Sequence, residues 1–174
     1  SKQSRGGLSL ANLRTNAGLI SRDRPNADHD NDQHCFLVSQ RSGYCQIAQN
    51  GQVIQLAPGD MLLMDSAGSI DITPFGLIEH ASLSLSRNEV CKHLGSDSRT
   101  FGKISSSKAC GRMLHVLMDQ LCREGQNGQD SNAEGEALQS AFVSLLGSAF
   151  EMNDTPGDSS AAFQGNTLRC YVQK

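Results

Sequence analysis

The sequence is poor in aromatic residues and in long apolar runs. It contains no tryptophan, and phenylalanine and tyrosine together make up only 5% of its 174 residues. No apolar run approaches the ~18 residues that a membrane-spanning helix needs, so we expect no contact with a membrane. Lysine and arginine number 15 against 18 aspartates and glutamates, and no basic stripe stands out. Since nucleic-acid binding requires clustered cations, this chain alone is expected not to bind DNA.

The six cysteines lack the spacing of a metal or redox site. No two of them form a Cys-x-x-Cys pair, which removes support for a zinc ribbon or a thioredoxin-type site. Cysteines in strands and helices usually behave as small buried apolar residues. We therefore expect reduced thiols, as in a cytoplasmic protein, at Cys35, Cys45, Cys91, Cys110, Cys122 and Cys170.

What the sequence does contain, between residues 43 and 65, is a series of short strands and tight turns. Asn50-Gly51 separates two strand-like segments, and both residues tolerate the positive φ of a type I′ hairpin turn. Pro58-Gly59 fits a type II turn, and the side chain of Asp60 can then bond nearby amides. The apolar run at 61–64 is typical of a strand covered on both faces.

Short strands separated by turns indicate a small β-sandwich or barrel, and the number of strands here fits a jelly-roll β-barrel. The predicted strands are Leu8–Arg14, Ala17–Arg22, His34–Arg41, Tyr44–Gln49, Gln52–Leu56, Met61–Asp65, Ile70–Thr73 and Leu77–Leu85. Asp65 is expected to form a turn by bonding the amide of Ala67 or Gly68.

His80 is the single histidine of the last predicted strand. It is expected at a strand end or partly exposed rather than as a metal ligand. Ser82 and Ser84 alternate with apolar residues on the same strand, so we assign them to its polar face.

The second part of the chain is helical. Apolar residues at three- and four-residue spacing predict one helix around 110–121 and another around 138–150. The apolar face of the second helix is wider than the ~100° of a simple surface helix, so it either covers the barrel or also meets a second copy. The residues assigned to such a dimer contact are Leu138, Ala141, Phe142, Leu145 and Ala149.

A small-molecule pocket in such a barrel would use side chains that point inward. Alternation places Phe36, Val38 and Gln40 on one face of their strand, where they combine apolar surface with one polar group. The predicted ligand-binding set is Phe36, Val38, Gln40, Ile47, Leu63 and Ile72, with Leu8, Leu10, Cys45, Met61 and Ile70 also inward. The alternative, which the sequence leaves open, is that all of these are ordinary core.

The turns and strands of residues 43–65, followed by residues 78–87, resemble the N-terminal cupin-like effector domain of AraC/XylS-type transcription regulators. The two predicted helices and the closing segment Leu168-Arg169-Cys170-Tyr171-Val172 match the part that precedes the two helix-turn-helix motifs in such regulators. The resemblance covers the chain from about residue 8 to its end. Within the family the chain is most similar to regulators of the FeaR type, activators of aromatic-amine catabolism.

The resemblance implies a barrel at 1–104 that senses a small-molecule effector and an antiparallel helical hairpin at 105–152 that supports a homodimer. Residues 153–174 would form a linker and the start of a helix leading to a DNA-binding domain that the sequence lacks. It implies no cofactor. The FeaR-type resemblance implies an aromatic effector, but the few aromatic residues argue against an aromatic cage for a cationic amine.

The rival class is a metal-dependent cupin enzyme, such as a dioxygenase or an isomerase. Its chemistry needs two or three histidines and a carboxylate converging inside the barrel. The strand at 35–41 supplies no such set, and residues 61–72 contain no histidine. We therefore expect no metal site, no catalytic residues and no enzymatic activity.

Overall fold

Most of the described chain forms one curled sheet with helices against one side. The computed structural model describes residues 2–5, 8–23, 33–95, 100–123 and 132–150. Within them the strands are β1 (Lys2–Arg5), β2 (Leu8–Thr15), β3 (Ile20–Arg22), β4 (His34–Gln49), β5 (Gln52–Leu56), β6 (Met61–Asp65), β7 (Ile70–Ser86) and β8 (Gly102–Lys103). The helices are α1 (Arg87–Leu94), α2 (Ala109–Arg123) and α3 (Asn132–Leu146). The predicted linker and further helix at 153–174 lie outside the described residues.

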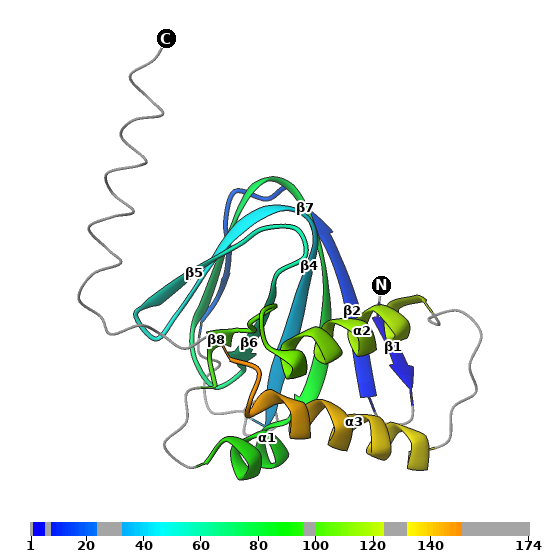
Figure 1. Cartoon of the computed structure of the whole chain (residues 1–174). Helices are drawn as coiled ribbons and strands as arrows, with labels where there is room; N and C mark the ends of the chain where they lie inside the picture. Colours follow the sequence, from blue (N-terminus) through cyan, green and yellow to red (C-terminus); the bar gives the residue numbers. More distant parts are fainter. Residues whose placement is uncertain (1, 6–7, 24–32, 96–99, 124–131, 151–174) are drawn as a thin grey trace.

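Strands β4 and β7 pair along their whole length and form the centre of the sheet (Figure 1). The strand order is β1-β2-β7-β4-β6-β8, and β3 and β5 pair with β7 and β4 respectively. Since β1 and β8 end this order, the sheet curls over without closing. The predicted jelly-roll fold with following helices is confirmed, as an open curled sheet rather than a complete barrel.

Two pairs of predicted strands are in fact two long strands. The segments at 34–41 and 44–49 join as β4, and those at 70–73 and 77–85 join as β7. The pairing register of β4 and β7 shifts on either side of Ser42. Gly43 and Gly76 have positive φ values, of 71° and 86°. A Cβ atom on Gly43 would collide with the carbonyl oxygen of Leu77. Glycine therefore lets the central strands bulge and bend without ending.

The two predicted turns are confirmed. Asn50 and Gly51 both have positive φ, at 52° and 75°, as a type I′ hairpin turn requires. Gly59 has a φ of 91°. The Asp60 carboxylate accepts a hydrogen bond from the Ala57 backbone N–H at 2.8 Å. These contacts fix the register of β5 and β6 on β4.

The two faces of the sheet have different partners. The helix face packs against the helices through residues such as Leu37 and Leu83. The interior face lines the inside of the curl and holds a second apolar cluster around Val38, Ile47 and Ile72. Figure 1 shows α2 and α3 side by side across the end of the sheet away from β5.

The segment 138–150, which includes most of α3, belongs to the core, and this corrects the predicted dimer contact. Phe142 and Ala149 are both 0% exposed and lie in the cluster on the helix face. Leu138 and Leu145 pack against the same cluster, and Ala141 is half-buried. The prediction of an intermolecular contact is therefore wrong for Phe142 and Ala149. The apolar face is broad because α3 contacts α1, α2 and β2 within one chain.

Candidate functional site

Four of the six predicted pocket residues belong to one apolar cluster on the interior face. Phe36, Val38, Ile47 and Ile72 belong to one apolar cluster, together with other side chains of the curl. Val38, Ile47 and Ile72 are buried, whereas Phe36 is half-buried. Cross-strand pairing places Ile47 directly opposite Ile72. The structure thus brings these four residues onto one surface, as alternation predicts.

Leu63 lies on the opposite face, which is a correction. It pairs with Leu37 across β6 and β4, and both belong to the cluster under the helices. Leu8, Leu10 and Met61, also predicted inward, lie in that same cluster. The whole run at 61–64 is buried on both faces, so its apolar pattern carries no information about which residues face inward.

Gln40 is buried on the interior face, but its side-chain amide is already bonded within the chain. Its Nε2 donates to the carbonyl oxygens of Ser42 and Gly43 at 3.0 and 3.2 Å. Its Oε1 lies 3.5 Å from the Cys45 Sγ. These bonds support the irregular part of β4, so Gln40 is not the free polar group that the sequence suggested.

A polar group that the sequence analysis undervalued lies beside Gln40. His80 pairs directly with Gln40 of β4 and with Leu13 of β2. It is only 4% exposed, which corrects the expected strand-end or partly exposed position. Burial lowers the pKa of its imidazole and so favours the neutral ring. Its Nδ1 is buried and has no hydrogen-bond partner among the residues that the structure describes.

Next to His80, the interior face is built from small side chains. Ser9 pairs with Ser84 and Ala11 pairs with Ser82 across β2 and β7, and all four are half-buried. The corresponding positions on the helix face include leucines whose side chains are buried in the core. This part of the interior face is therefore open to solvent and offers both polar and apolar contact.

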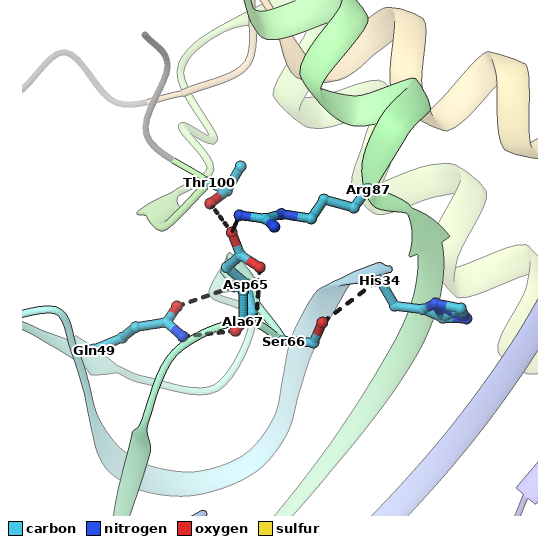
Figure 2. Close-up of polar contacts among 7 residues, drawn as sticks. All are labelled: His34, Gln49, Asp65, Ser66, Ala67, Arg87 and Thr100. Carbon is cyan, nitrogen blue, oxygen red and sulfur yellow. Dashed lines mark hydrogen bonds and ion pairs between the residues drawn. The ribbon is translucent and has the colours of Figure 1, made fainter. Parts of the chain in front are cut away.

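A second polar cluster joins β4, β6 and α1 (Figure 2). The Asp65 carboxylate accepts bonds from the Ala67 backbone N–H and from Arg87 Nη2, each at 2.9 Å, and from the Thr100 hydroxyl. The Gln49 side chain bonds both backbone groups of Asp65, at 3.0 and 2.6 Å. The predicted bond from Asp65 to the Ala67 amide is confirmed. Because this carboxylate is fully bonded, its role is structural.

The five cysteines that the structure describes are free, and Cys170 lies outside the described residues. Burial, with a contribution from Asp65, raises the pKa of the Cys35 thiol to about 12. Burial raises the pKa of Cys45 to about 11. Since the thiolate is the reactive form, neither group is a nucleophile at neutral pH.

Over the described ranges, no three histidine, cysteine, aspartate or glutamate side chains gather in a way that could hold a metal ion. None of the helices described is long and apolar enough to cross a membrane.

No protein-family model and no curated protein matches the sequence. Among solved structures, the AraC-like transcriptional activator CuxR matches with a TM-score of 0.70 at 11% identity, over 99% of this chain and 65% of that one. A cupin protein from Bacteroides fragilis matches at 18% identity over 46% of this chain and 66% of its own, with a TM-score of 0.37. A cupin-2 domain containing protein from Shewanella frigidimarina matches at 13% identity over 48% and 78%, with a TM-score of 0.37.

The match to the AraC-like activator establishes the fold. It extends over 99% of this chain, so it includes the helices as well as the sheet. This chain spans 65% of the length of that activator. The resemblance to a cupin-like AraC-type effector domain is confirmed at the level of fold, while the FeaR-type subgroup stays a prediction.

Proposed function

We propose that this chain is the effector-sensing and dimerisation domain of a bacterial, cytoplasmic AraC-type transcription regulator. The observation that carries the proposal is the shape match to an AraC-like activator, which covers sheet and helices together. In this proposal DNA is contacted by a further domain outside the sequence. The net charge of −3 agrees with DNA contact by another domain, since this chain offers little electrostatic attraction to DNA phosphates.

The effector-sensing part is supported by the interior face. Its apolar cluster around Val38, Ile47 and Ile72 continues into the half-buried surface beside His80. Small-molecule sites are mostly apolar with a few polar groups, which is the composition found here. We propose that an effector binds on this surface.

The rival proposal, a metal-dependent cupin enzyme, has less support. A metal centre needs several ligands on one surface. Of the described histidines, His93 lies on α1 and His115 on α2, whereas His80 lies on β7. His34 lies at the start of β4, about 20 Å along the strand from Gln40, the partner of His80. We therefore propose a binding domain that is not an enzyme and needs no cofactor.

Of the two longer helices, α2 rather than α3 carries large apolar side chains that the structure describes as exposed. Met113 and Val116 lie one turn apart on α2 and are 49% and 58% exposed. The apolar residues of α3 are instead used within the chain. We propose that a second copy covers Met113 and Val116, since paired DNA half-sites are read by a two-fold symmetric dimer.

A reporter assay tests this proposal. The 174-residue chain is fused to a DNA-binding domain that represses a promoter only as a dimer. We expect the fusion to repress, and we expect the double variant Met113→Glu/Val116→Glu to lose repression, because two charges would be buried in the contact. Ser144→Glu, at an exposed position of α3, is the matched control and should still repress. Failure of the unmodified chain to repress would refute the dimerisation proposal.

A further inference from the structure

The unbonded nitrogen of His80 and the small side chains beside it point to one class of ligand. We propose that the interior face around His80 binds an uncharged, largely apolar small molecule that forms one hydrogen bond with the His80 ring. This inference rests on the proposed effector-sensing function and specifies the chemistry of the effector.

The first step concerns hydrogen bonding. Nδ1 of His80 is buried without a partner among the described residues, and a buried polar group left unbonded costs free energy. Its two cross-strand neighbours do not satisfy it, since the Gln40 amide bonds Ser42 and Gly43 and Leu13 is apolar. A neutral imidazole presents one N–H and one lone pair, so a ligand can satisfy it as an acceptor or as a donor.

The second step concerns room. Ser9, Ala11, Ser82 and Ser84 form two directly opposed pairs on β2 and β7, and each is half-buried. Phe36 pairs with Ser84 from the other side, on β4, and is half-buried as well. A molecule lying over the small side chains would contact the Phe36 ring at one side and reach His80 at the other. This arrangement favours a ligand with a flat apolar surface.

The third step concerns charge. No described side chain on the interior face of β2, of β4 between residues 36 and 40, or of β7 between residues 78 and 84 is charged. At the edge of the sheet, Lys2 of β1 is paired in register with Ala11, two strands away from His80. At the margin of this surface, Lys103 and Asp60 pair with each other at 2.9 Å. Arg22 of β3 is the cross-strand partner of Ile70. Ile70 lies about 30 Å from His80 along β7. The cross-strand partners of His80, Leu13 and Gln40, are both uncharged. A carboxylate or phosphate directly beside His80 would therefore lose its hydration without gaining an opposite charge from them.

The test compares two probes that share one ring system. 2-Naphthol is uncharged at pH 7 and carries one hydroxyl, whereas 2-naphthoate carries a carboxylate. Each is titrated into the chain labelled with ¹⁵N and ¹³C, while NMR follows the histidine ring nitrogens and the isoleucine methyl groups. We expect saturable binding of 2-naphthol that shifts the His80 nitrogens and the methyls of the interior face, with 2-naphthoate about tenfold weaker or worse.

Variants separate a direct hydrogen bond from a general loss of structure. His80→Phe should weaken 2-naphthol about fivefold to tenfold, the worth of one hydrogen bond, and His80→Gln should weaken it less. His115→Phe, on α2, is the control and should leave affinity unchanged. Circular dichroism of each variant confirms that it has folded.

Three results would overturn the inference: binding of 2-naphthol that His80→Phe does not weaken, absence of 2-naphthol from the interior face, or 2-naphthoate binding there as tightly as 2-naphthol. The last result would remove the uncharged class but leave effector sensing standing. The dimer reporter tests the regulator proposal separately.

Discussion

Replacing Phe142 with alanine is expected to lower the free energy of unfolding by about 3–5 kcal/mol. Phe142 is 0% exposed and lies in the core between α3 and the helix face of the sheet. Removing the ring leaves a cavity that the surrounding side chains close only in part, which adds to the lost burial of apolar surface. Urea unfolding followed by circular dichroism measures the change.

The matched control for this prediction is Leu19→Ala, between β2 and β3. Leu19 is 59% exposed, so its truncation should change the free energy of unfolding by no more than about 0.5 kcal/mol. Sedimentation of the Phe142→Ala variant decides between the two views of α3. If stability were unchanged and a dimer became a folded monomer, the apolar face of α3 would be intermolecular after all.

Replacing Asp65 with alanine is expected to lower the free energy of unfolding by about 2–3 kcal/mol. The change removes the acceptor of three hydrogen bonds, from Ala67, Arg87 and Thr100. The Arg87 side chain is 38% exposed, so its freed charge reaches water in part. The expected loss of unfolding free energy is therefore smaller than for an ion pair whose two side chains are both buried. Urea unfolding again provides the measurement.

Two variants serve as controls for the Asp65 prediction. Asp65→Asn keeps an oxygen for the Ala67 amide but removes the charge that pairs with Arg87, so its loss should be intermediate. Glu89→Gln breaks the exposed Glu89–Lys92 pair and should have no measurable effect. Equal stability of Asp65→Ala and the unmodified chain would show that this cluster does not hold α1 to the sheet.

The features that could be predicted from the sequence are those decided by local chemistry. Asn50-Gly51 and Pro58-Gly59 specify their turns because few residues tolerate the positive φ values found there. The turns, in turn, specify which strands are neighbours. The long strands were missed because Gly43 and Gly76 look like strand ends in sequence, whereas in the sheet they allow bulges.

The features that could not be predicted depend on what covers each face. Leu63 lies in a run that is apolar at every position, so periodicity gives no inward direction. The position of His80 can be inferred from its alternation with Ala81, but its burial depends on β2 and β4 on either side. The broad face of α3 has the same pattern whether it meets a second copy or its own core. In this chain it meets the core, and Phe142 lies inside it.

Effector binding on the interior face can be tested by a thermal-shift screen of small uncharged and anionic compounds, on the unmodified chain and on Ser82→Phe. Ser82 is half-buried on the interior face, so a phenyl ring there would fill the proposed site. Ser144→Phe, at an exposed position of α3, controls for the added ring. At a hundredfold excess over its dissociation constant a ligand adds about 2.7 kcal/mol, which raises the melting temperature by about 5–10 °C. We expect such a shift for at least one uncharged compound in the unmodified chain and in Ser144→Phe, and none in Ser82→Phe. An absence of any shift in the unmodified chain, or an equal shift in Ser82→Phe, would contradict this expectation.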